Sequence, residues 1–157
     1  MLNLLSLNLE LPQDYWEPRT RHGIDRVVVN YYRPLLQNLP AHHTRLGAHT
    51  GFGLLSILKD DGNEGLEVQV DPHKSKEFVP VAIPEDCICV NLGDLMELFT
   101  NRRYRSTMHR VTLPKDRTKE RKSLVYVTHF NTSATVEPHP TQITPERPDC
   151  GIKLNAL

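Results

Sequence analysis

The sequence predicts a single all-β domain, built as a β-sandwich or a jelly roll, and three observations support this fold class. The chain has 157 residues, a length that suits one domain. Its 12 prolines against 8 glycines favour turns and strand ends over long helices. About seven short runs rich in β-branched and aromatic residues follow one another at close spacing, as in all-β domains.

A leucine-rich segment opens the chain and predicts a short helix. Leu2, Leu5 and Leu9 fall on one helical face, and nothing upstream could cover that face. We therefore expect the chain to begin inside a larger fold. Strands are then predicted at 25–32, 53–58, 66–70, 78–83, 87–90, 107–113 and 123–130.

Turn residues separate these runs, and one helical element interrupts them. Asp60-Asp61-Gly62-Asn63 and Asp71-Pro72 are typical turn sequences, and both aspartates of the first are expected to serve only the turn. Leu92, Leu95 and Leu98 have helical spacing and predict one or two helical turns among the strands.

We divide the chain into three parts. Residues 1–20 form a helical lead-in, residues 21–131 the β-rich core, and residues 132–157 an irregular, proline-rich tail. The N-terminus lacks the cationic segment of a signal peptide, and three cysteines cannot all pair within the chain. A cytoplasmic location is the expectation.

The overall charge excludes two classes of partner from the prediction. The 19 basic residues balance the 19 acidic ones, so nothing attracts the chain to nucleic acid or to an anionic membrane. No apolar stretch approaches the roughly 20 residues that cross a bilayer. The oligomeric state stays open.

Two histidines and an arginine carry the strongest chemical signal. His49 precedes a predicted strand and His109 lies within another, so only the fold of a sheet could bring them together. Arg121 and Ser123 alternate on one side of the next strand, and neighbouring antiparallel strands could aim His109 and Arg121 at one cavity. An arginine fork beside a serine hydroxyl is a natural receptor for a carboxylate.

The other histidines are expected to be structural or solvated. His129 is predicted to be a satisfied side chain of the core or of the barrel wall. The predicted surface histidines are His22, His42, His43, His73 and His139.

An ordered series of motifs resembles the 2-oxoglutarate/Fe(II)-dependent dioxygenases, most closely their plant-type and isopenicillin N synthase-like branch. The series runs from Val29-Asn30-Tyr31-Tyr32 through LGAHTGFGLL at 46–55 and STMHRV at 106–111 to Arg121-Lys122-Ser123. It covers residues 24–131 in the family's order. The resemblance implies a jelly roll of the double-stranded β-helix type behind the short N-terminal helix. Because relatives carry further segments on both sides of this barrel, it also implies a chain truncated at both ends.

The resemblance implies an Fe(II) site that has lost one ligand. His49 and His109 match the two imidazole ligands of the family. The third ligand is an aspartate two residues after the first histidine, and that position holds Gly51. Loss of a ligand carboxylate is expected to weaken iron binding, since loss of outer-shell support alone typically costs ~10–100-fold.

The resemblance also implies a site for 2-oxoglutarate as co-substrate. Arg121 and Ser123 match the pair that binds its distal carboxylate, Tyr32 would add a hydroxyl there, and Asn30 would lie near the keto-acid end. The implied reaction is hydroxylation or desaturation of a small organic substrate by molecular oxygen, coupled to decarboxylation of 2-oxoglutarate.

Several alternatives stay open at this point. The chain could be an impaired dioxygenase, a halogenase-like variant that takes a halide at the position of the missing ligand, or an inactive member or fragment that acts as a binding scaffold. An oxidase that dispenses with 2-oxoglutarate is a further option, and the sequence does not identify the primary substrate.

Overall fold

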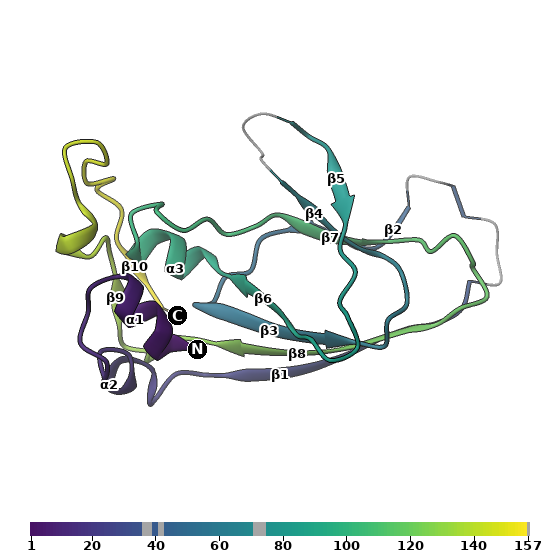
Figure 1. Ribbon diagram of the computed structural model, residues 1–157, viewed down its shortest axis with the longest axis horizontal. Helices are drawn as coiled ribbons and strands as arrows, with labels where there is room; N and C mark the ends of the chain where they lie inside the picture. Colours follow the sequence, from purple (N-terminus) through teal and green to yellow (C-terminus); the bar gives the residue numbers. More distant parts are fainter. Residues whose placement is uncertain (36–38, 41–42, 71–74, 157) are drawn as a thin grey trace.

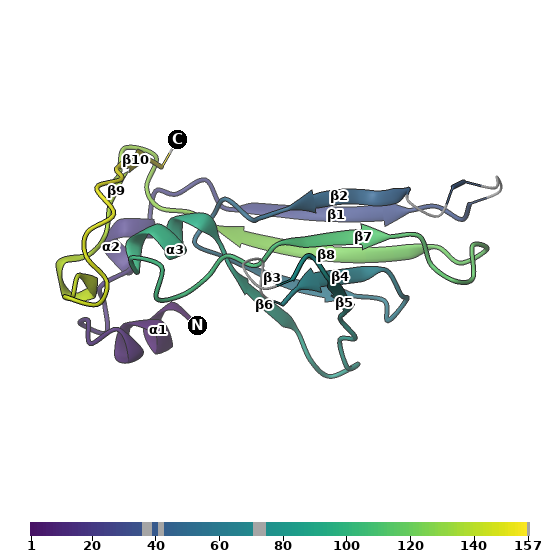
Figure 2. The same cartoon turned by 90° about the horizontal axis from the view of Figure 1, so that it is seen from above.

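Two facing four-stranded sheets, with helices and the C-terminal tail gathered at one end, make up the computed structural model (Figures 1 and 2). The structure describes residues 1–35, 39–40, 43–70 and 75–156. The first sheet has the order β1-β8-β3-β6, with bounds Arg26–Tyr32, Arg121–Thr128, Leu55–Asp60 and Cys89–Leu92. The second has the order β2-β7-β4-β5, with bounds Thr44–His49, His109–Thr112, Leu66–Gln69 and Phe78–Pro80.

Strand β8 lies in the middle of the first sheet and organises it. It pairs antiparallel with β1 on one side, where Asn30 lies opposite Ser123 and Tyr32 opposite Arg121. On its other side it pairs antiparallel with β3, where Asp60 lies opposite Ser123. Because side chains alternate along a strand, every second residue of β8 points into the space between the two sheets.

Strand β2 is the element of the second sheet that the sequence prediction missed. It contains Gly47 and Ala48, which have low β-propensity, so its run of residues carries no strand signal. Its pairing with β7 is irregular, with register shifts on both sides of Leu46, and it ends with His49 opposite His109. Pairing with β7, not local preference, makes this segment a strand.

The hydrophobic core lies at the helical end of the molecule (Figure 1). Three helices, α1 (Leu2–Asn8), α2 (Glu17–Thr20) and α3 (Asp94–Phe99), gather there. The core consists of the buried residues Leu9, Leu11, Trp16, Leu54, Leu95, Met96, Leu98, Phe99, Phe130, Val136 and Ala156. Since these side chains pack beside the sheets, the space between the sheets stays open for a site.

The N-terminal leucine face has a partner, which corrects one prediction. Leu9 is fully buried in the core, and Leu2 and Leu5 pack against it. The exposed leucines of α1 are instead Leu4 and Leu7, on its other side. The apolar face of this helix is thus covered by the chain's own core.

The seven predicted strands and the helix near Leu95 are confirmed, with ends shifted by a few residues. The tail also holds a pair of two-residue strands, β9 (Thr135–Val136) and β10 (Leu154–Asn155), and a 3-10 turn at Pro140–Gln142, none of which was predicted. The predicted turn at Asp71-Pro72 and the predicted surface histidines His42 and His73 lie outside the described residues. Every helix in the described ranges is too short or too polar to cross a membrane.

Candidate active site

The two histidines singled out in the sequence lie side by side. His49 ends β2 and His109 begins β7, and the pairing of these antiparallel strands places the two residues directly opposite each other. Their ring centroids are 4.3 Å apart. Both rings line a cavity between the two sheets. The second sheet therefore brings together the residues that sequence alone left far apart.

Backbone carbonyls orient both imidazoles in the same way. Nδ1 of His49 donates to the carbonyl oxygen of Gly47 at 2.8 Å, and Nδ1 of His109 donates to that of Thr107 at 2.9 Å. Because a carbonyl only accepts, each Nδ1 carries a proton, and in a neutral ring this leaves the lone pair on Nε2. Burial lowers the pKa of His109, which favours the neutral ring that a metal needs.

Gly51, two residues after His49, has no side chain that could bind a metal, but a polar side chain lies next to it. A Cβ built on Gly51 would lie 3.6 Å from Nδ2 of Asn91, an ordinary contact distance. That Nδ2 is buried and has no hydrogen-bond partner among the described residues. A buried amide donor without an acceptor is uncommon, and here it faces the place where a side chain at 51 would begin.

No nearby carboxylate takes over this position in the described part of the chain. Asp94 lies beside this position, and its backbone N–H donates to the carbonyl of Gly51 at 2.7 Å. Its carboxylate instead accepts from Oγ1 of Thr50 at 3.1 Å. Within the described ranges, no three His, Cys, Asp or Glu side chains lie close enough to hold a metal ion.

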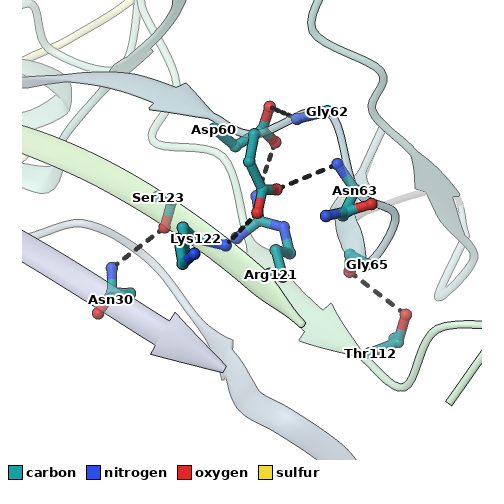
Figure 3. A network of polar contacts seen from close by, with 10 residues as sticks. Asn30, Asp60, Gly62, Asn63, Gly65, Thr112, Arg121, Lys122 and Ser123 are labelled. Carbon is teal, nitrogen blue, oxygen red and sulfur yellow. Dashed lines mark hydrogen bonds and ion pairs between the residues drawn. The ribbon is translucent and has the colours of Figure 1, made fainter. Parts of the chain in front are cut away.

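At the other end of the same cavity, Arg121 is a buried cation with free donors. Its side chain is 1% exposed, and Nη2 donates to Oδ2 of Asp60 at 2.8 Å (Figure 3). Its Nε and Nη1 are buried and have no partner among the described residues. Because buried N–H groups are normally satisfied, these two donors point to a ligand with acceptor oxygens, such as a carboxylate.

The ion pair corrects the sequence prediction for Asp60. That aspartate was expected to be only a turn residue, but it ends β3 with its side chain 5% exposed and in contact with Arg121. Asp61 accepts from the backbone N–H groups of Asn63 and Lys122, as the turn prediction implies. No local signal distinguishes the two aspartates, because the contact of Asp60 crosses between strands distant in sequence.

The remaining residues of this arginine end come from β1 and β8. Asn30 Nδ2 lies 3.4 Å from Oγ of Ser123, to which it donates (Figure 3). The Arg121 guanidinium lies 5.7 Å from the centre of the Tyr32 ring. Burial raises the pKa of Tyr32, so its hydroxyl stays protonated and available as a donor. We call Arg121, Ser123, Tyr32 and Asn30 the arginine end.

The cavity that joins the histidine pair to the arginine end has a volume of about 640 Å³. Its wall between the two polar ends is apolar and includes Val28, Val125 and Val127. No aspartate or glutamate among the described residues lines it. The described lining of the cavity thus presents imidazole nitrogens and arginine N–H groups and no carboxylate.

Two histidines differ from their predicted environments. His129 does line the barrel wall, but Nδ1 of this buried ring has no partner in the described structure, so it is not satisfied as predicted. His139 was expected at the surface, yet its ring packs against those of Tyr15 and Phe99 in the helical end. The alternation of residues along β8, continued one residue past the end of the strand, is the signal that places His129 in the cavity with Arg121.

A family model described as the 2OG-Fe(II) oxygenase superfamily matches residues 23–130, more than half of the chain. The chain is 35% identical over 118 residues to the proline hydroxylase buaE of Petromyces alliaceus, covering 73% of this chain and 36% of that protein. It is 34% identical over 117 residues to the 2-oxoglutarate-dependent dioxygenase htyE of Aspergillus rugulosus, covering 73% and 35%. The chain therefore spans about a third of the length of these curated relatives.

Solved structures confirm the jelly-roll prediction. A 2OG-Fe(II) oxygenase family protein from Caulobacter crescentus is 28% identical, with a TM-score of 0.84 over 99% of this chain and 50% of that one. A full-length Neurospora crassa protein in complex with alpha-KG is 23% identical, with a TM-score of 0.87 over 98% and 48%. The second likeness shows the fold alone.

Proposed function

The chain belongs to the 2OG-Fe(II) oxygenase superfamily, and we propose that it supplies the barrel of an oxygenase that acts on a small organic substrate. The reaction is hydroxylation or desaturation by molecular oxygen, coupled to decarboxylation of 2-oxoglutarate. One observation carries this proposal: a pair of oriented imidazoles and a buried arginine with free N–H groups share a single cavity.

The donor set of the histidine pair fits Fe(II) in part. His49 and His109 would hold the metal through Nε2, since their Nδ1 atoms are engaged by backbone carbonyls. A facial site for this metal normally adds one carboxylate, and Gly51 provides none. Bound Fe(II) supplies the activation of oxygen in this class of enzyme.

The arginine end would orient the co-substrate. Arg121 offers Nε and Nη1 to the distal carboxylate of 2-oxoglutarate, and Ser123 and Tyr32, which line the same cavity, each bring a hydroxyl. Asn30, bonded to Ser123, would lie on the side toward the keto acid. Asp60 holds the guanidinium through Nη2, so the two free donors stay turned toward the ligand.

A second function is favoured by Gly51. Without a ligand carboxylate, the barrel could bind 2-oxoglutarate or a related acid at the arginine end without turning it over. The chain would then act as a binding scaffold. A halide in place of the missing carboxylate is the third reading, and dependence of any turnover on chloride or bromide would identify it.

Succinate formation from 2-oxoglutarate, with added Fe(II), separates these readings in the 157-residue chain and its Gly51→Asp variant. Turnover by the natural chain supports the oxygenase. Turnover only in Gly51→Asp, with 2-oxoglutarate stabilising both proteins against heat, supports the scaffold. Absence of both turnover and ligand-linked stabilisation in both proteins would contradict the proposed function.

A further inference from the structure

The cavity has a second polar region that the proposed reaction does not use. Along β8, the alternating residues Arg121, Ser123, Val125 and Val127 line the cavity, and His129, one residue past the end of the strand, lines it too. At roughly 3.3 Å per residue, His129 lies about 26 Å along the chain from Arg121, at the opposite end of the cavity. Polar groups therefore occur at both ends of this strand, with valines between them.

His129 lies against Phe52 and Gly53, a few residues after His49 in the chain. Its ring is 6.4 Å from that of Phe52, and its Cε1 would be 3.4 Å from a Cβ on Gly53. The residue is 8% exposed, and its Nδ1 has no partner among the described residues. A buried polar atom on a cavity wall thus lies close to where the chemistry of the site is proposed.

Arg26 is an unpaired cation beside this histidine. It lines the same cavity, and its partner in the neighbouring strand is Val127, two residues before His129. Among the described residues, the Arg26 side chain has no hydrogen bond and no ion pair. The adjacent Asp25 accepts from the backbone N–H of His129 at 3.0 Å and from the hydroxyl of Tyr126, and no ion pair joins it to Arg26 among the described residues.

The charged groups among the described residues that line the cavity are both cations: Arg121 is buried, and Arg26 lies exposed at the cavity edge. Arg121 has a counter-ion in Asp60, and one incoming carboxylate is assigned to it by the proposed function. Arg26 has neither, and no described carboxylate lines the cavity. The glycine at 51 makes this imbalance larger, because the family's aspartate there would have carried a negative charge.

We propose that Arg26, with His129 beside it, binds a carboxylate of the primary substrate. One guanidinium fork matches the two oxygens of a carboxylate, and a ring nitrogen of His129 adds a hydrogen bond to one of them. The wall formed by Val28, Val125 and Val127 suits an apolar body for that acid. The assignment rests on the proposed function for the reaction itself and names the substrate class as organic acids.

We call Arg26 and His129 the rim pair. Its positive charge is carried by Arg26 and not by His129. Burial lowers the pKa of His129, and the neighbouring Arg26 lowers it further, so the ring is neutral near neutral pH. A neutral ring has one N–H donor and one acceptor nitrogen. Loss of Arg26 should therefore weaken acid binding more than loss of His129.

Ligand-observed NMR on the metal-free chain, with 2-oxoglutarate at saturation, tests the assignment. The probes are phenylacetate, hexanoate and N-acetylglycine, each compared with its primary amide, which keeps the shape but not the charge. We expect at least one acid to bind roughly tenfold more tightly than its amide. Arg26→Gln should abolish this preference and His129→Gln should reduce it. Arg33→Gln, just past the other end of β1, should leave it unchanged.

The outcomes separate this inference from the proposed function. If 2-oxoglutarate stabilises the natural chain and Arg26→Gln equally, but acids bind no better than amides, the rim assignment is overturned and the co-substrate site stands. A preference for acids that survives Arg26→Gln overturns it as well. If 2-oxoglutarate itself fails to bind the natural chain, the proposed function fails first.

Discussion

At the arginine end of the cavity every side chain that the family resemblance calls for is present, whereas at the histidine pair one of the three expected ligands is missing. The two ends also differ in how far their buried N–H donors have hydrogen-bond partners. Arg121 has a buried partner in Asp60 and two donors left for a ligand. Asn91 has a buried donor with no partner among the described residues, facing the bare Cα of Gly51.

This difference shows that the two ends are built independently. Arg121 and Asp60 lie on adjacent strands of the first sheet, and no described contact of theirs passes through Gly51. His49 and His109 belong to the second sheet. Loss of a carboxylate at 51 therefore leaves the arginine end intact, which is what a protein that binds 2-oxoglutarate but turns it over poorly requires.

The largest effect is expected at the arginine end. Arg121→Met should lower the free energy of unfolding by about 3–5 kcal/mol, because it leaves the Asp60 carboxylate buried without a cation. It should also abolish stabilisation by 2-oxoglutarate. Urea denaturation measures the first effect and thermal shift the second.

The double variant Arg121→Met with Asp60→Asn is the control, since it removes both charges. It should recover much of the lost stability but none of the ligand binding. A loss below about 1 kcal/mol in Arg121→Met would mean that the ion pair is solvated.

The next effect concerns the missing ligand. Gly51→Asp should raise the affinity for Mn(II) or Fe(II) by at least about tenfold, because it restores an anionic oxygen beside the two imidazoles. The position has room for a side chain, with Asn91 at ordinary contact distance. Anaerobic calorimetric titration measures the affinity.

Gly51→Asn is the matched variant, equal in size but uncharged. Equal metal affinity in the Asp and Asn variants would show that charge at this position does not matter. If Gly51→Asp binds the metal no more tightly than the natural chain does, the histidine pair is not a metal site.

A smaller effect is expected from the unpartnered amide. Asn91→Leu should stabilise the natural chain by about 1 kcal/mol, since it removes a buried donor that has no acceptor in the described structure. In the Gly51→Asp background the same change should destabilise, because the amide then has a carboxylate to bond. A double-mutant cycle from urea denaturation gives the coupling, and identical effects in the two backgrounds would disprove it.

The smallest effect is on pH dependence, to which the buried His109 should contribute and the arginine end, whose four residues include no histidine, should not. Burial lowers the pKa of His109 in the folded chain below its ordinary value of 6.5. The unfolded chain therefore takes up the proton first, and the stability of the metal-free protein should fall as pH drops below 6.5.

Substitution of the histidine checks the source of this effect. His109→Gln should reduce the dependence below pH 6.5, measured by urea denaturation at several pH values, while His129 and His139, whose pKa values burial also lowers, keep their share. His22→Gln, at an exposed histidine, is the control. Equal slopes in both variants and the natural chain would assign the acid sensitivity to other groups.

Much of the fold could be read from local patterns. The strands β1 and β8 were predicted because valines, tyrosines and alternation make them recognisable alone, and the helix α3 because its leucines repeat at helical spacing. Strand β2 was missed because Gly47 and Ala48 give no such signal, and its extended form depends on β7.

The residues of the site also fall into two groups, those that local sequence patterns predicted and those that they did not. The alternation of Arg121 and Ser123 placed both on the cavity side, and the motif series pointed to His49 and His109. The ion pair of Asp60, the orphaned amide of Asn91 and the unpaired Arg26 carried no local signal. Each is defined by which partner it meets, or does not meet, on another strand.

By itself, the sequence determined the class of strand-rich fold, the order of its motifs and the absence of a carboxylate at Gly51, because these depend on residue type and short-range spacing. Only the tertiary structure decided which charges are neutralised and which stay free. A charge acquires a partner through strand register and burial, and these arise when segments distant in sequence pack together.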